Sequence, residues 1–459
     1  MTNSTAKNRI QDMTEGSPFR CIINFAFPIF LGMLFQQLYN MADTMIVGQF
    51  LGLNALAGVG ATGSLYFLVI GSCTGICNGF AIPIAQMFGA KNTPMLKKMA
   101  AASGVLCSAL AVIVTLITVL ACHPLLRMMN TPADAYDYAY KYIVVIFAGI
   151  PFTLLYNMVA SIIRSLGDSR TPVIFLILSS VLNIALDLLF ILVIPLNVMG
   201  AALATVIAQA VAGIGSLIYL HKKFDIIRTT KSDWIPTVFV YFRLCAIGFP
   251  MGLQYAITAI GSIVIQSAVN AFGEATVAGV AAANKLYSLI SCPLEAIGAT
   301  MATYAGQNIG AGKLERVSKG LLTGTVMGLV LSVVTFVLMY FFGYQINLLF
   351  IDPGETLALQ QAYRYTLICT AGFPLLTCIL TFRFSIQGMG FATFAMLAGV
   401  LEMIARCFVG IVLPDHLGYT SVCISSPAAW LTADLFLIPA FFYCRHKMKR
   451  ALGYESPHR

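Results

Sequence analysis

SGVLCSALAVIVTLITVLAC, residues 103–122, contains no charged side chain over 20 residues. At a rise of about 1.5 Å per residue, a helix of this length spans about 30 Å, the thickness of the hydrocarbon core of a bilayer. Of the 459 residues of the chain, 59% are hydrophobic and 10% are charged, against about 45–50% and about 25% in soluble domains. This composition excludes a soluble enzyme, a secreted disulfide scaffold and a disordered chain. It predicts a polytopic membrane protein.

Apolar runs of similar length divide the chain into twelve predicted transmembrane helices. Glycine, proline and charged residues interrupt the runs and set their boundaries to within a few residues. We place the spans at residues 19–47, 54–87, 97–122, 136–160, 171–194, 198–221, 241–268, 276–307, 316–342, 357–385, 391–413 and 422–444. The 12 cysteines stand singly inside such runs, so we interpret them as small core residues and not as disulfide partners. The predicted fold is an all-α polytopic membrane protein.

Positive charges gather on alternate loops of this arrangement. Loops that face the cytoplasm carry an excess of lysine and arginine. One set of segments holds Lys7, Arg9, Arg20, Lys91, Lys97, Lys98, Arg164, Arg170, Lys222, Lys223, Arg228, Lys231, Arg243, Lys313, Lys319, Arg445, Lys447, Lys449 and Arg450, and the other holds only Arg127, Lys141, Lys285 and Arg364. We therefore predict that both termini are cytoplasmic. The net charge of +9 follows from the same bias, so no nucleic-acid partner is needed to explain it.

The two halves of the chain repeat one another at a spacing close to 220 residues. Phe27-Pro28 recurs as Phe249-Pro250, the segment 86–90 recurs as 307–311, and Ala148-Gly149-Ile-Pro151 recurs as Ala371-Gly372-Phe-Pro374. Six spans in each half give both halves the same orientation, which is a parallel repeat. We predict two six-helix lobes, residues 1–222 (with a short cytoplasmic N-terminal segment) and 241–459 (with a basic cytoplasmic tail), joined by a cytoplasmic linker at 223–240.

Polar residues share helix faces in the first half. An ionisable group at the bilayer centre costs about 2.5–3.5 kcal/mol, so each one needs a partner or a role. Helical spacing groups Gln36, Tyr39, Asn40 and Asp43 on the first span, Asn183 and Asp187 on the fifth, and Thr205 and Gln209 on the sixth, while Asn157 adds an amide from the fourth. This half offers two carboxylates and several neutral oxygens but no cation inside the membrane. Such ligands suit a proton or a small cation such as Na⁺.

The second half differs at the matching positions. Asn183 and Asp187 correspond to Glu402 and Arg406, which lie at i and i+4 and can neutralise each other, and apolar residues stand opposite Asp43. We therefore place the titratable site in the first lobe alone. We interpret Asp434 as mostly structural, because it has no polar neighbour at helical spacing.

No sequence motif indicates an enzyme. The segment 310–313 lacks the first glycine and the final hydroxyl residue of a phosphate-binding loop, and the five histidines are far apart, so we expect no ATP site, no metal cluster and no catalytic residue. If the two lobes move a solute against its concentration gradient, the energy must come from an ion gradient. We expect H⁺ or Na⁺ as the coupling ion and no cofactor or ATP-binding subunit.

Four parts of the sequence resemble the multidrug and toxic compound extrusion (MATE) transporters, particularly the prokaryotic DinF-like branch. They are the stretch from Gln36 to Gly48, the start of the loop at Gln86…Gly89-Ala90, the loop from Arg164 to Asp168, and the pair Asn183 and Asp187. The resemblance covers essentially the whole chain.

It implies cation-coupled export of amphipathic, often cationic compounds from a prokaryotic cell membrane, through a cavity that opens alternately to each side. The positions that match the family's coupling site are Gln36, Tyr39, Asp43, Asn157, Asn183, Asp187 and Thr205. Pro28 matches a proline at which the first helix bends, and the carboxylates that bind sodium in the second lobe of NorM-like members are missing.

Three hypotheses follow from the residues and the resemblance together. The first is a cation-coupled antiporter with small organic cations as substrates, Gln36, Tyr39, Asn40 and Gln209 lining the substrate cavity, and a monomer in contact with membrane lipids. The second is a lipid-linked oligosaccharide flippase of the same superfamily shape. Its pyrophosphate substrate would favour several lysine or arginine side chains in the cavity, and only Arg406, with Arg383 near a cytoplasmic end, is available. The third is a non-transporting membrane enzyme or receptor.

Overall fold

A computed structural model describes residues 11–129, 131–235 and 237–453, and these residues contain helices and no strand. Ten helices are long and apolar enough to cross a membrane, or up to 12 spans when each of two bent helix pairs is taken as one. The predicted all-α polytopic fold is therefore confirmed. Lys7, Arg9 and the rest of the first ten residues lie outside the described part.

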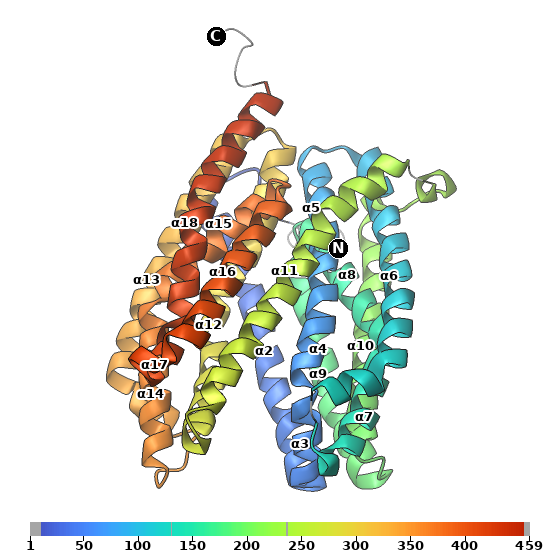
Figure 1. Cartoon of the computed structure of the whole chain (residues 1–459). Helices are drawn as coiled ribbons and strands as arrows, with labels where there is room; N and C mark the ends of the chain where they lie inside the picture. The colour runs from blue at the N-terminus through green and yellow to red at the C-terminus, as the bar shows by residue number, and fades with distance from the viewer. Residues whose placement is uncertain (1–10, 130, 236, 454–459) are drawn as a thin grey trace. The chain divides into compact units, whose positions relative to one another are not determined.

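The helices follow one another with short connections (Figure 1). In chain order, they are α2 (Pro18–Leu51), α3 (Leu53–Ala61), α4 (Gly63–Tyr66), the π-helix η1 (Phe67–Gly71), α5 (Ser72–Gly89), α6 (Thr93–Met128), α7 (Ala133–Ala148), α8 (Ile150–Ser165), α9 (Arg170–Leu188), the π-helix η2 (Leu189–Val193) and α10 (Val198–Lys223). They continue as α11 (Val238–Asn270), α12 (Glu274–Gly310), α13 (Leu314–Asn347), α14 (Thr356–Ala371), α15 (Phe373–Gly388), α16 (Ala392–Val412), α17 (Pro414–Leu417) and α18 (Tyr419–Ala451).

The chain forms two compact units that are not simply its two halves. Among the described residues, unit 1 contains 11–12 and 31–252, and unit 2 contains 13–30 and 253–453. The predicted division at residues 223–240 differs from this partition, because the first part of α2 packs in unit 2 and the first part of α11 packs in unit 1. Each of these helices changes unit two residues after its proline, Pro28 or Pro250.

Two glutamines at equivalent places in the repeat hold these first parts. In unit 1, Arg243 at the start of α11 donates to Gln86 Oε1 at 2.8 Å. In unit 2, the backbone N–H of Met13 donates to Gln307 Oε1 at 3.0 Å. Both glutamines are buried, and a buried side-chain amide needs a hydrogen-bond partner. The repeated Gln motif therefore fixes where each incoming segment enters its unit.

Helix pairing inside the units follows the same repeat. In unit 1, α8 packs on α5, α6 and α10, and α9 packs on α10. In unit 2, α15 packs on α12, α13 and α18, and α16 packs on α18. The spans that correspond by sequence thus have corresponding neighbours.

One span in each unit is bent at the repeated Gly-x-Pro motif. The axes of α7 and α8 differ by 49°, and those of α14 and α15 differ by 50°. Pro151 and Pro374 lie at the start of the second helix of each pair, where proline has no N–H to continue the hydrogen bonds of the first helix. The bend is therefore a property of the sequence motif.

The loop before α9 is shaped by Asp168. Its Oδ1 accepts hydrogen bonds at 3.0 Å from the N–H groups of Arg170 and Thr171, which supply a cap for the first turn of the helix. Gly167 has a φ of 91°, and its carbonyl accepts a 2.9 Å bond from the N–H of Gln11. This part of the motif that resembles MATE proteins is explained by loop geometry and helix capping.

The linker after α10 contains two short 3₁₀ turns, η3 (Asp225–Ile227) and η4 (Lys231–Trp234). The N–H of Thr230 donates to Asp233 Oδ2 at 2.7 Å, and its hydroxyl donates to the same oxygen at 2.8 Å. These hydrogen bonds lower the pKa of the Asp233 carboxyl. The segment is therefore locally structured.

Two glycines allow α5 and the first part of α11 to touch within unit 1. A Cβ added at Gly79 would lie 2.5 Å from the Cα of Gly248, and this backbone atom cannot rotate away. The absence of side chains at this contact sets the distance between the two helices.

We expect Gly79→Val to lower the stability of the protein by about 1–3 kcal/mol, because the added atoms overpack a backbone contact. Thermal unfolding of the purified, detergent-solubilised protein measures this change. Gly104→Val is the matched control, since no atom lies within 4 Å of a Cβ added there. Equal melting temperatures for the two variants would show that α5 and α11 do not depend on this contact.

Candidate functional site

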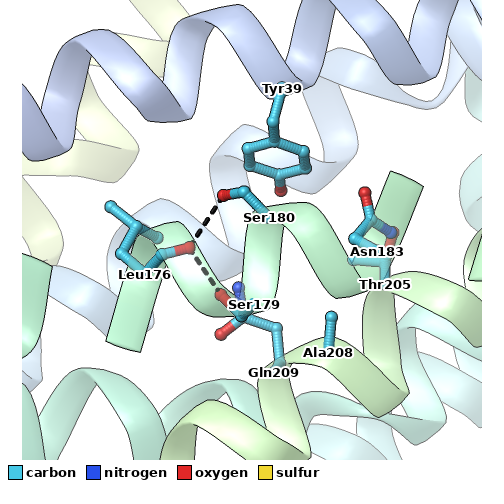
Figure 2. Close-up of a pocket in the computed structure, with 8 residues that line it drawn as sticks. All are labelled: Tyr39, Leu176, Ser179, Ser180, Asn183, Thr205, Ala208 and Gln209. Carbon is cyan, nitrogen blue, oxygen red and sulfur yellow. Dashed lines mark hydrogen bonds between the residues drawn. The ribbon is translucent and has the colours of Figure 1, made fainter. Parts of the chain in front are cut away.

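A small pocket opens inside unit 1 among α2, α9 and α10. Its volume is about 210 Å³, including the space at its open mouth, and it is lined by Tyr39, Leu176, Ser179, Ser180, Asn183, Thr205, Ala208 and Gln209. Figure 2 shows the phenol of Tyr39 reaching from α2 toward Ser180 and Asn183 on α9, with Gln209 and Ala208 on α10. The Asn183 side chain donates to Thr205 Oγ1 at 3.3 Å. The structure thus brings together four of the residues that helical spacing had selected: Tyr39, Asn183, Thr205 and Gln209.

Ser179 and Ser180 belong to this pocket and were missed in the sequence. Both hydroxyls donate to the carbonyl of Leu176, at 2.9 and 2.8 Å, so their oxygens remain free to accept from, or coordinate, a ligand. The available signal was their position three and four residues before Asn183, which places them one helical turn away on a similar face.

The two acids of the first lobe lie one helical turn further along, Asp43 after Tyr39 and Asp187 after Asn183. Their carboxyl groups are close enough to interact electrostatically. Asp187 is fully buried and Asp43 is half-buried, and the two carboxyl groups lie close enough to share a hydrogen bond when one of them holds a proton. Within the described residues, no other group donates a hydrogen bond to either oxygen of Asp187 or to Oδ1 of Asp43. Within the described part of the chain, no lysine or arginine forms an ion pair with either acid.

Three tyrosines surround Asp43. Tyr39 on α2, Tyr66 on α4 and Tyr142 on α7 all lie near enough to interact with its charge. Tyr66 and Tyr142 were not selected from the sequence, because nothing in their spacing distinguishes them among 19 tyrosines. Their phenol rings therefore lie in the neighbourhood of the acids.

None of the other predicted site residues lines the pocket, Asp43 and Asp187 included. Gln36 and Asn40 are exposed on α2. Asn157 on α8 donates to the carbonyl of Thr153 at 2.8 Å, within its own helix. Pro28 lies in the part of α2 that belongs to unit 2, inside the helix.

In unit 2, the buried acids Glu402 and Asp434 each lie near an arginine. Glu402 forms a buried ion pair with Arg383 on α15, whereas the nearest Arg406 nitrogen is 4.0 Å from Glu402 Oε2. The predicted i, i+4 contact is present, but the closer partner comes from the neighbouring helix. Asp434 on α18 also interacts with Arg383, so this acid has a charged neighbour that spacing along its own helix did not reveal.

The arrangement in unit 1 can bind a cation, because buried carboxylate oxygens without donors are stabilised by a proton or a positive ion. No group of three or more His, Cys, Asp or Glu side chains placed to hold a metal ion occurs in the ranges that the structure describes. Any Na⁺ would therefore rest on the two carboxylates and on neutral oxygens such as those of Asn183 and Thr205.

The MatE family model matches residues 28–189 and 250–412, which are the two repeated halves. The chain belongs to the MATE family. The expected family is thus confirmed, and since this is a family of transporters, the protein is a transporter and not an enzyme.

Similar proteins agree with this assignment. The probable multidrug resistance protein YoeA of Bacillus subtilis is 30% identical over 76% of this chain and 76% of its own length. The FAD transporter of Shewanella oneidensis is 25% identical over 77% and 79%. A structure described as the outward-facing conformation of a multidrug resistance MATE family transporter of the MOP superfamily superposes with a TM-score of 0.89 at 22% identity, over 98% of this chain and 99% of that one. This likeness shows the fold.

The ion pair in unit 2 predicts a non-additive mutant series. Arg383→Met leaves Glu402 without its close partner, so we expect a loss of about 3–5 kcal/mol in stability, as for other broken buried pairs. Adding Glu402→Gln to the same chain removes the uncompensated charge and should restore much of the loss. Thermal unfolding in detergent compares the two variants. A double variant that is no more stable than Arg383→Met would contradict the pairing.

Proposed function

We propose that this MATE transporter is an antiporter that exports amphipathic organic cations in exchange for H⁺ or Na⁺. The observation that carries the proposal is the close pair of half-buried Asp43 and fully buried Asp187, which has no positive partner among the described residues. Two like charges at this distance repel each other, so the site is most stable with a cation or a proton bound.

The exchange follows from competition for these acids. A substrate cation is attracted while at least one acid is ionised, and the phenols of Tyr39, Tyr66 and Tyr142 can add ring contacts with the cation. Arrival of H⁺ or Na⁺ removes the net negative charge and releases the substrate. Because α2 carries Tyr39 and Asp43, a change of charge also changes the forces on this helix, and Pro28 is the hinge at which we expect it to bend.

The small volume of the pocket supports binding of the coupling ion and of the substrate at different places. A cavity must offer about 10–15 Å³ to the centre of a water molecule in order to hold one. The pocket beside Asn183 offers about 10 Å³ of such space, which is far too little for a drug-sized ligand. We assign this pocket to the coupling ion and its water, and the exposed polar side chains Gln36 and Asn40 to the substrate path.

We place both termini and the linker in the cytoplasm of a bacterial cell, on the strength of the lysine and arginine bias of the loops. We propose a monomer in contact with lipid, with small organic molecules as substrates and no ATP-binding subunit. The names of relatives such as YoeA favour drugs as substrates, whereas the relative named FAD transporter is named for a different kind of molecule. A lipid-linked oligosaccharide is the alternative cargo, and the acid-lined site of unit 1 argues against its pyrophosphate.

Asp43→Asn and Asp187→Asn should each abolish uphill efflux, since either change removes a charge for which ion and substrate compete. Purified protein in proteoliposomes, given a pH gradient or a sodium gradient one at a time, measures dye efflux and identifies the ion. Asp137→Asn is the matched control, because Asp137 is exposed and pairs only locally with Lys141 at 2.6 Å. Coupled efflux in both site variants at the control rate would rule out the proposal.

Substrate and proton should compete at equilibrium as well. Acidification from about pH 8 to about pH 5 should weaken binding of a cationic dye, because protonated carboxyls no longer attract it. By linkage, the dye should promote release of protons. Fluorescence polarisation across this range tests the wild type and Asp43→Asn, in which the pH dependence should be lost. A wild-type affinity that does not change with pH would separate the substrate from these acids.

A further inference from the structure

The linker between α10 and α11 presents apolar side chains on the surface of unit 1. Trp234 is 51% exposed and Ile235 is 83% exposed. Val238, Phe239 and Phe242, in the first turns of α11, are exposed as well and lie on one side of that helix. A group of exposed apolar side chains of this kind marks a place that contacts a partner or a membrane.

The fold of the linker directs these side chains outward. Phe224 is buried, and Ile226 and Ile227 pack against the core of unit 1. The indole N–H of Trp234 donates to Thr229 Oγ1 at 2.9 Å, so this polar group is satisfied while half of the side chain stays accessible. The exposed side chains therefore belong to a segment whose other residues are held in place by packing and hydrogen bonds.

Basic side chains adjoin the apolar ones. The first turns of α6 pack against η3 and η4, and Lys97 and Lys98 on α6 lie near enough to Asp233 to lower the pKa of its carboxyl. Asp233 itself is buried and accepts both hydrogen bonds from Thr230, whereas Lys231 is exposed. The neighbouring segments add Lys91, Lys222, Lys223 and Arg228, of which Arg228 pairs with Asp225 at 3.0 Å. Positive charge therefore dominates this part of unit 1.

The position of the linker fits the headgroup layer of a bilayer. It joins the end of α10 at Lys223 to the start of α11 at Val238, and both helices are long and apolar enough to cross a membrane. Tryptophan is enriched at the interface between membrane and water, and clusters of lysine and arginine beside a transmembrane helix attract anionic lipids. A soluble acidic protein would match the charges, but it would not explain why the apolar surface continues from the linker onto a helix that can cross the membrane.

We propose that the linker surface, formed by Lys97, Lys98, Lys231, Trp234 and Ile235, binds the headgroups of anionic phospholipids. The lysines meet the charge of the headgroup, and Trp234 and Ile235 enter the layer beneath it. The inference depends neither on the cargo nor on the coupling ion. Because α11 begins directly after this surface and contributes to both units, bound lipid holds the start of a helix that the two units share.

The fluorescence of Trp234 tests which lipids surround it, because bromine atoms on acyl chains quench a nearby indole. The chain has two tryptophans, and Trp430→Phe leaves Trp234 as the single indole. This variant of the full-length protein is placed in bilayers of phosphatidylcholine and phosphatidylglycerol at a fixed ratio, with the bromine on one lipid or on the other. The two degrees of quenching give the lipid composition around Trp234.

We expect phosphatidylglycerol to be enriched about 10-fold around Trp234 relative to the whole bilayer, since several lysines act together. A composition equal to that of the bilayer would overturn the proposal. Absence of quenching by either lipid would overturn it as well, because it would show that water or a soluble protein covers the linker surface.

Two lysines at equivalent positions of the repeat test the role of charge. Lys98 on α6 corresponds to Lys319 on α13, at the spacing that relates Gln86 to Gln307, and Lys319 is exposed. Lys98→Gln should lower the enrichment of phosphatidylglycerol about fivefold, and addition of Lys97→Gln should remove it. Lys319→Gln takes the same charge from unit 2 and should leave the enrichment unchanged. Equal effects of Lys98→Gln and Lys319→Gln would contradict the assignment to the linker surface.

Measurements without these variants keep the test decisive if one of them does not fold. Trp430 is 3% exposed, so the wild type and Trp234→Phe, compared in the same bilayers, give the quenching of Trp234 by difference. A rise in NaCl from about 0.1 M to about 1 M shortens the screening length from about 10 Å to about 3 Å, and the enrichment should fall with it. An enrichment that salt does not change would rule out recognition by charge.

Inorganic phosphate distinguishes a lipid headgroup from a free anion. At equal ionic strength, sodium phosphate should lower the enrichment of phosphatidylglycerol no more than sodium chloride does, because a free phosphate lacks the acyl chains beside Trp234. A specific effect of phosphate would mean that the lysines bind the free anion and that the lipid assignment is wrong. None of these measurements involves transport, so their failure leaves the antiport proposal untouched.

Discussion

A carboxylate within a bilayer needs a positive charge beside it, and the two units of this transporter differ in whether the protein supplies one. In unit 2, Arg383 lies against Glu402 and close to Asp434, so both acids have a positive neighbour within the chain. In unit 1, Asp43 and Asp187 face each other among tyrosines with no described cation to pair with. The same helical framework therefore holds acids that have a positive neighbour within the chain and acids that have none among the described residues.

The repeat explains how one framework serves both purposes. Helix pairing and the bends at Gly149 and Gly372 are alike in the two units, so the shape is duplicated while the charges are not. The docking of each incoming segment is duplicated as well, with Gln86 holding Arg243 and Gln307 holding the backbone of Met13. Because α2 and α11 each contribute to both units, neither unit is assembled from a continuous half of the sequence.

Local patterns in the sequence carried most of what could be predicted. Uncharged runs predicted the spans, and the helical period placed Asn183 and Asp187 on one helix face and Thr205 and Gln209 on another, because these features depend on a single helix. The bends at Gly149 and Gly372 were not predicted, although the repeated motif that contains them was recognised. Arg383 as the partner of Glu402, and Tyr66 and Tyr142 beside Asp43, depend on which helices are neighbours, and no spacing along one helix contains that information. The packing of the first part of α2 in unit 2 escaped prediction for the same reason. The backbone just before this helix is held by side chains that are far away in the sequence, namely Gln307, Asn308, Lys313 and Arg316.

The modest size of the pocket beside Asn183 bears on how selective such a protein can be. The cavity has room for about one water molecule, far below the range of drug-sized sites. Under the proposed mechanism, the ion and the organic molecule then compete through electric charge and not through occupied volume. Competition of this kind does not depend on the shape of the substrate. Compounds of unrelated shape exchange for the same ion, provided that each brings its charge near the same two acids. A wide substrate range then requires no adaptable cavity at the coupling site, because the electric field of the two acids extends beyond the pocket.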